Sequence, residues 1–139
     1  MVQRLRLVIP SVAILVCTSC VNPADMNIGK AGVNHFHEEL NAGLSDEIYR
    51  DAGQEYRGAT TEEFNRKFTE AVRRKMGKVE RFEVTTWRLN YSTNGKFLAL
   101  ECKTEFTNGG AEESFQWRID GKRAVLMGWH INSPLLVVN

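Results

Sequence analysis

The chain has 139 residues, of which 42% are hydrophobic and 25% charged, with 18 basic and 17 acidic side chains. This length suffices for one domain with a hydrophobic core and is too short for two. The balanced charge offers no basic surface of the kind that binds nucleic acid, so we expect no nucleic-acid partner.

The first 19 residues have the pattern of a secretory signal peptide. Arg4 and Arg6 precede an apolar stretch from Leu7 to Val16, and small polar residues follow it. The stretch is shorter than the ~20 apolar residues that span a bilayer as one helix. We therefore expect export with cleavage before Cys20, which leaves 16 basic and 17 acidic residues and a formal charge of −1.

The residues before the expected cleavage site resemble the lipobox of bacterial lipoproteins. Thr18 and Ser19 match the small residues of that pattern, whereas Cys17 stands where the family usually has leucine. The resemblance implies that Cys20 is acylated and holds the domain stably at a membrane. It also implies the outer membrane in a Gram-negative source, because no aspartate follows Cys20. The alternative is a plain exported protein cut at the same bond.

A polar stretch over residues 20–32 follows the expected cleavage site. It contains Pro23, Gly29 and Gly32 and no sustained apolar period. This composition predicts a flexible tether. A single domain is then expected over residues 33–139.

Three helices are predicted in the first half of this domain. Asn34 can cap a helix that runs to about Ala42, and Ser45 can cap a short helix over 46–51. The strongest pattern lies between Thr60, which forms a capping box with Glu63, and the terminating Gly77. Its apolar residues recur at helical spacing and must cover another element; they are Phe64, Phe68, Ala71, Val72 and Met76.

The second half alternates between apolar and polar residues and predicts four strands. Asn94-Gly95, the glycine pair after Asn108, and Asp120-Gly121 are typical hairpin turns, so the strands should form an antiparallel meander. The expected strands cover Arg81–Tyr91, Phe97–Phe106, a third centred on Phe115–Ile119, and Lys122–Asn132.

Helices followed by a meander predict an α+β domain in which helices pack on a curved sheet. The order of elements resembles the nuclear transport factor 2-like (NTF2-like) fold, a cone whose helices lie in the concavity of an antiparallel sheet. The helix segment Phe64–Phe68 and the strand segments around Trp87 and Phe115–Ile119 look like those of bacterial lipoproteins in that superfamily. A cystatin-like helix across a meander is the alternative. Because the superfamily contains enzymes, binding modules and dimerisation domains, the fold does not choose among them.

Candidate pocket residues are few in this sequence. Aromatic and titratable side chains at Tyr49, Tyr56, Trp87, Trp117 and His130 could line the cone, although core packing is the simpler interpretation of the tryptophans. No nucleophile elbow, phosphate-binding loop or dinucleotide fingerprint is present, so we assign no catalytic residue and no cofactor.

The histidines and the remaining cysteine are interpreted as structural. His35 and His37 are two residues apart, which directs them to nearly opposite sides of a helix, so solvated or capping roles are expected and no metal site. Cys102 shares a strand face with Leu98 and Leu100 and is expected to be buried. If Cys20 carries no lipid, a Cys20–Cys102 disulfide is the alternative.

The opposite face of the same strand begins with Phe97 and Ala99 and continues with charged residues. An apolar patch at one end of a solvated sheet could support a homodimer. The preferred hypothesis is therefore a membrane-anchored, non-enzymatic binding or dimerisation module. The alternatives are a small-ligand-binding protein and an enzyme with an acid–base pocket in the cone.

Overall fold

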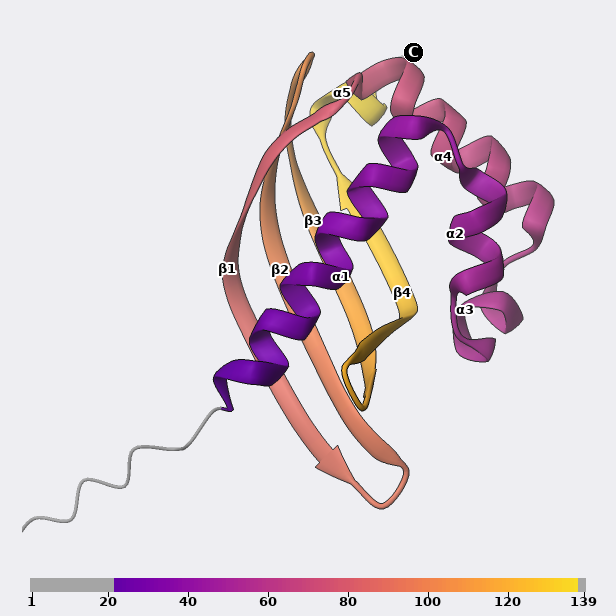
Figure 1. Ribbon diagram of the computed structural model, residues 1–139. Helices are drawn as coiled ribbons and strands as arrows, with labels where there is room; N and C mark the ends of the chain where they lie inside the picture. The colour runs from indigo at the N-terminus through magenta and orange to yellow at the C-terminus, as the bar shows by residue number, and fades with distance from the viewer. Residues whose placement is uncertain (1–21, 138–139) are drawn as a thin grey trace, which may run out of the picture.

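The computed structural model describes residues 22–137 and confirms the α+β class and the four-stranded antiparallel sheet (Figure 1). The sheet order is β1-β2-β3-β4, a plain meander. Cys20 and the predicted signal segment 1–19 lie outside the described residues. The elements are α1 (Pro23–Ala42), α2 (Ser45–Asp51), α3 (Gln54–Ala59), α4 (Glu62–Met76), β1 (Val79–Ser92), β2 (Gly95–Phe106), β3 (Gly109–Asp120), β4 (Arg123–Asn132) and α5 (Pro134–Val137).

The first helix is much longer than expected, so the prediction of a flexible tether over residues 20–32 is wrong for residues 23–32. Helix α1 begins at Pro23, and the Asn22 side chain caps it by accepting a hydrogen bond from the Ala24 N–H at 3.1 Å. At Gly29 and Gly32, α1 lies close to side chains of the sheet. A Cβ at Gly29 would stand 2.4 Å from Leu98 Cδ2. These glycines therefore permit close packing within a helix.

The remaining helices follow the prediction with shifted boundaries and one addition. Thr61, not Thr60, caps α4 through a 3.1 Å bond from the Phe64 N–H. Ser45 is the first residue of α2, not its cap, and its hydroxyl lies 2.6 Å from that of Thr69 in α4. Neither α3 nor the short α5 was predicted, because both are too short to show an apolar period.

Helix α1 crosses one face of the sheet diagonally, and α2, α3 and α4 stand beyond β4 (Figure 1). The strand face beneath α1 is the predicted one: Leu98, Leu100 and Cys102 are at most 2% exposed. Cys102 is a buried free thiol, as expected. The core joins this face to Phe36 and Leu40 of α1.

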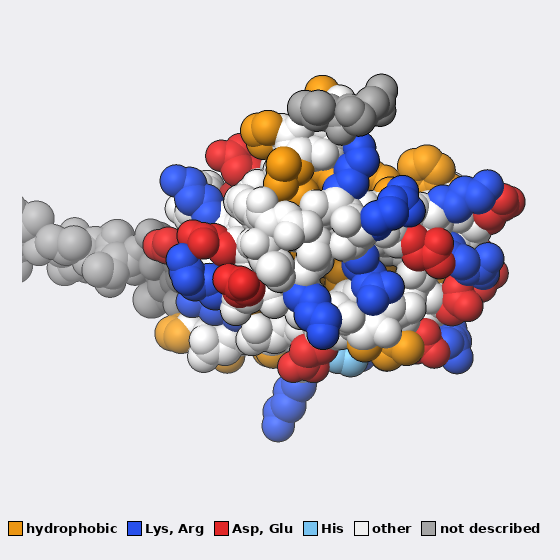
Figure 2. All heavy atoms as spheres, turned by 90° about the horizontal axis from the view of Figure 1, so that it is seen from above, with side chains coloured by type: hydrophobic (Ala, Val, Ile, Leu, Met, Phe, Trp, Pro, Cys, Tyr) orange, Lys and Arg blue, Asp and Glu red, His pale blue; other side chains and the backbone are white. Residues whose placement is uncertain are grey.

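The outer surface carries charges of both signs. Seen from above, Lys and Arg side chains are interspersed with Asp and Glu (Figure 2). Several of them form ion pairs on the surface, for example Arg81 with Glu105 across β1 and β2 at 2.9 Å. Such exposed pairs contribute at most about 1 kcal/mol each, so the buried core contributes more to the stability of the fold than these surface pairs do.

Candidate functional site

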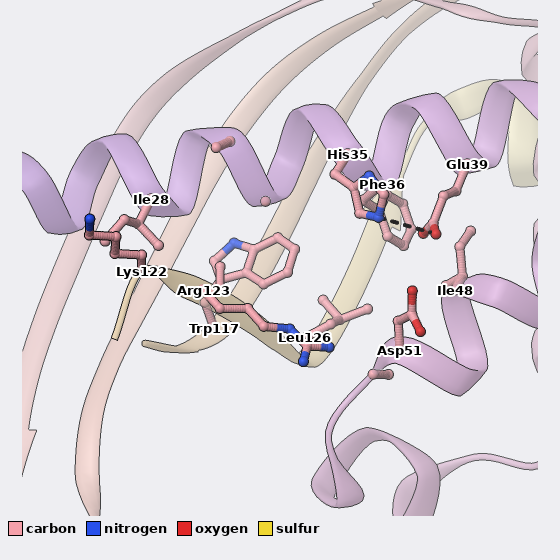
Figure 3. Close-up of a pocket in the computed structure, with 14 residues that line it drawn as sticks. Ile28, His35, Phe36, Glu39, Ile48, Asp51, Trp117, Lys122, Arg123 and Leu126 are labelled. Carbon is pink, nitrogen blue, oxygen red and sulfur yellow. Dashed lines mark ion pairs between the residues drawn. The ribbon is translucent and has the colours of Figure 1, made fainter. Parts of the chain in front are cut away.

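A cavity of about 430 Å³ lies between α1, α2 and the β3–β4 hairpin (Figure 3). Apolar side chains form its body: Phe36, Ile48, Trp117 and Leu126 belong to the buried core and also line the cavity. Titratable side chains stand at its two ends. The cavity therefore combines an apolar interior with charged groups at fixed positions.

One end holds His35, Glu39 and Asp51, whose potential ligand atoms all lie within 4.8 Å of one another. Figure 3 shows the three side chains directed toward one another. His35 Nε2 is 3.3 Å from Glu39 Oε1, one helical turn along α1. Burial raises the pKa of the Glu39 carboxyl, the His35 charge opposes this, and repulsion from Asp51 and Glu47 adds to the rise.

The backbone explains why Asp51 meets α1. Gly43 ends α1 in the left-handed conformation, with φ of 75°, and its N–H bonds back to carbonyls of the last turn. Only Leu44 then separates it from α2, so the chain reverses tightly and α2 runs back beside α1. Asp51, the last residue of α2, consequently faces Glu39.

The other end of the cavity is basic. Lys122 and Arg123 come from the β3–β4 turn and line the cavity; Lys122 lies beside Ile28, whereas the Arg123 side chain extends along the cavity toward Leu126 (Figure 3). Neither cation forms an ion pair or hydrogen bond with any residue between 22 and 137, so both are free to meet an anionic group. An anion in this cavity would be attracted to the turn and repelled by Glu39 and Asp51.

The five candidate pocket residues do not share one cavity. Trp117 lines the cavity described above, whereas Tyr56 and His130 line a separate open groove between α3, α4 and β4. Tyr49 lies in the helical layer, and its hydroxyl is 3.3 Å from the carbonyl oxygens of Arg57 and Thr60. Trp87 is on the edge strand β1, 43% exposed and remote from the helices beyond β4.

That open groove carries little polar chemistry. The Tyr56 hydroxyl donates to Asn65 Oδ1 at 2.8 Å, and burial raises the pKa of Tyr56 to about 12. His130 is exposed. Phe64, predicted to pack inward, is instead 62% exposed at the groove and stacks on Phe68.

His37 is neither solvated nor a helix cap, which corrects the sequence interpretation. It is 4% exposed, and its Nε2 lies 2.8 Å from Oε2 of Glu113, which is 1% exposed. Thr104 Oγ1 and Trp129 Nε1 also donate to Glu113, at 2.5 and 3.0 Å. Neither His37 nor Glu113 lines the cavity between α1 and α2 or the groove between α3, α4 and β4. This buried polar cluster is a structural element of the core.

The candidate interface residues lie on the face away from α1, as predicted. Phe97 and Ala99 are half-buried and border a depression of about 210 Å³ with Arg88, Asn90 and Met127. The neighbouring positions along β2 on this face are charged and exposed. The apolar area is therefore small, and the homodimer stays a prediction.

No protein-family model matches the chain, and no curated protein matches it. Within residues 22–137, no helix combines the length and the hydrophobicity that a membrane crossing needs. Function is therefore inferred from the geometry of the cavity and its charged ends.

The spacing of His35 and Glu39 was a readable signal that the sequence interpretation did not use. Residues four apart on a helix share a face, so an imidazole and a carboxylate at that spacing can act together. The contribution of Asp51 was not readable, because it depends on the tight reversal at Gly43.

Proposed function

We propose that this chain is an exported, lipid-anchored domain that binds a small molecule in the cavity between α1, α2 and the β3–β4 hairpin. The observation that carries the proposal is the cavity itself, about 430 Å³ in volume, with an apolar body and charged ends. Ligand sites in proteins occupy roughly 300–1,000 Å³ and combine apolar walls with a few oriented polar groups.

The charge distribution suggests the class of ligand. Lys122 and Arg123 are unpaired within the described part of the chain and favour an anionic group at the turn. Phe36 and Trp117 line the apolar interior of the cavity and favour a ligand with a flat hydrocarbon or aromatic body. We infer a ligand with an apolar body and one anionic end.

A fluorescent probe of that chemistry tests the proposal. Anilinonaphthalene sulfonate has an aromatic body and a sulfonate, so we expect saturable binding with enhanced fluorescence. Ala31 is exposed and lines the cavity, so Ala31→Phe should fill its mouth and weaken binding by about tenfold or more. Ala42→Phe, at the exposed end of the same helix and outside the cavity, is the matched control. Equal binding by both variants would place the probe elsewhere.

Charge reversal provides a second arm. An ion pair at a partly exposed rim contributes about 1 kcal/mol, and Arg123→Glu replaces this attraction by repulsion, so the variant should weaken sulfonate binding by at least about fivefold. The uncharged probe N-phenylnaphthylamine should bind wild type and Arg123→Glu alike. A comparable loss of affinity for both probes would show that the substitution changes the shape of the cavity, and that the loss does not come from the charge.

Attachment through Cys20 is the second part of the proposal. It is supported by the signal-like segment 1–19 and by the small residues before Cys20. We expect the wild-type protein in the membrane fraction and the Cys20→Ser variant in the soluble exported fraction. A wild-type protein that is already soluble would contradict the lipid anchor.

We also propose the NTF2-like fold for this α+β architecture. Support comes from the cavity between α1 and the β3–β4 hairpin and from three further helices beyond β4, since the cystatin-like alternative needs only one helix across the meander. Superposition of an experimental structure on both fold types tests the assignment. A better match to the cystatin-like type would contradict it.

A further inference from the structure

We propose that His35, Glu39 and Asp51 bind one divalent transition-metal ion at the acidic end of the cavity. This inference extends the small-molecule binding function proposed above. The biological meaning of the metal site rests on that function. The metal would give the cavity a second point of attachment for a ligand, opposite Lys122 and Arg123.

The geometry is close to that of a three-ligand site. The imidazole nitrogen and the two carboxylate oxygens lie within 4.8 Å of one another. Metal–ligand bonds of about 2.0–2.2 Å in a tetrahedral site place ligand atoms about 3.4 Å apart. The His35 side chain is 63% exposed and Asp51 is exposed too, so rotation of these side chains can close the difference.

Glu39 supplies an independent reason to expect a cation. Its side chain is only 10% exposed, and it accepts no hydrogen bond from any residue in the described range. Its one close partner is the His35 ring, while the carboxylate of Asp51 repels it. A mostly buried carboxylate whose one close partner is an exposed imidazole is unfavourable unless a proton or a cation neutralises it. A metal ion between Glu39 and Asp51 would neutralise both carboxylates.

The donor set indicates the class of metal. One imidazole and two carboxylates suit Zn²⁺, Mn²⁺, Fe²⁺ or Co²⁺, whereas Ca²⁺ and Mg²⁺ prefer oxygen donors alone. Three protein ligands leave at least one coordination position for water or a ligand. Phe36 and Ile48, which border the three side chains, line the cavity onto which that position would open.

Calorimetric titration of the chelator-treated mature chain with Zn²⁺ at neutral pH tests the proposal. We expect one Zn²⁺ per chain, with affinity reduced at least about tenfold in His35→Ala and in Asp51→Asn. His130→Ala, which removes another exposed imidazole, is the matched control and should bind Zn²⁺ like wild type. Absence of binding by wild type, or unchanged binding by His35→Ala, would overturn the site.

Thermal unfolding separates ligation from general destabilisation. Without metal, Asp51→Asn removes a repulsive charge from Glu39 and should leave the melting temperature unchanged or higher. At a hundredfold excess of Zn²⁺ over the wild-type Kd, the wild-type melting temperature should rise by about 10 °C, and that of Asp51→Asn should rise by about half as much or less. A lower metal-free melting temperature for this variant would contradict the repulsion between the two carboxylates and overturn the inference.

The metal site and the small-molecule function fail in distinguishable ways. Anilinonaphthalene sulfonate binding is measured in chelator, where no metal is bound. Probe binding without Zn²⁺ binding overturns the metal site and leaves the cavity function standing. Zn²⁺ binding without probe binding supports the metal site and overturns the apolar ligand.

Discussion

Replacement of Glu113 should remove a large part of the stability of the domain. This carboxylate is 1% exposed and accepts hydrogen bonds from His37, Thr104 and Trp129. Glu113→Ala leaves three buried donors without an acceptor, and each costs about 1–3 kcal/mol. Because the losses are not additive, we expect a total of about 4–6 kcal/mol, comparable to breaking a buried ion pair. Net stabilities of domains are about 5–15 kcal/mol, so the variant should be marginally folded.

Urea unfolding monitored by circular dichroism measures this difference. Glu112→Ala is the matched control, because Glu112 is the preceding residue, is exposed, and points to the other face of β3. It should change the free energy of unfolding by less than about 0.5 kcal/mol. Glu113→Gln keeps one carbonyl acceptor and should fall between the two. A Glu113→Leu variant that is as stable as wild type would refute the reasoning, since it would show that the donors tolerate an apolar neighbour.

Three further predictions concern single side chains. Burial, with smaller effects of Glu113 and Glu101, raises the pKa of Cys102 to about 12. In the Cys20→Ser chain, a thiol reagent should therefore modify Cys102 only after unfolding. Rapid labelling of Cys102 in the native protein would contradict this. The pKa of Glu39 is raised above its unfolded-state value of 4.5, so ionisation of Glu39 removes stability as pH rises through the raised pKa. Metal-free Glu39→Gln should therefore unfold at higher urea than wild type at neutral pH, with an advantage that vanishes by about pH 4; an advantage that persists in acid would exclude ionisation as its cause. For the predicted homodimer, Phe97→Glu should reduce the mass measured by light scattering from two chains to one, and a wild-type monomer would reject the interface.

The strands were predictable because their signals are local. Side chains alternate with a period of two, and glycine follows each hairpin's polar turn residue. Gly95 and Gly121 have φ of 133° and 60°, which other residues rarely adopt. These turns fix the register in which neighbouring strands pair, so the buried face of β2 could be assigned correctly from the sequence.

The start of α1 could not be predicted in the same way. Glycine lowers helix propensity, and residues 23–32 lack a clear apolar period. In the folded chain, tertiary contact outweighs that cost, since Gly29 packs against Leu98 where a Cβ would stand 2.4 Å away. The start of α1 therefore depends on the distance between the helix and the sheet, and the sequence of residues 23–32 alone does not reveal that distance.

The buried pair of His37 and Glu113 could have been predicted from the spacing of apolar residues in the sequence. The period of two places Phe115, Trp117 and Ile119 of the predicted third strand on one face, and continuation by one alternation places Glu113 on the same face. His37 likewise lies four residues after Val33, on the inward side of α1. Two ionisable residues at inward positions of facing elements indicate a buried pair, because an isolated charge in a core is too costly.

The corrected start of α1 changes what a lipid on Cys20 would do. Only residues 21 and 22 separate Cys20 from the helix, a reach of about 10 Å, whereas a 13-residue tether would reach about 45 Å. Asp25 also bonds Lys96 of β2 at 2.9 Å, which ties the start of α1 to the sheet. A lipid at Cys20 would thus hold the whole domain near the bilayer. Ile28, beside the basic end of the cavity, lies about one and a half helical turns along α1 from Pro23, so a lipid on Cys20 would place the cavity at or close to the membrane surface.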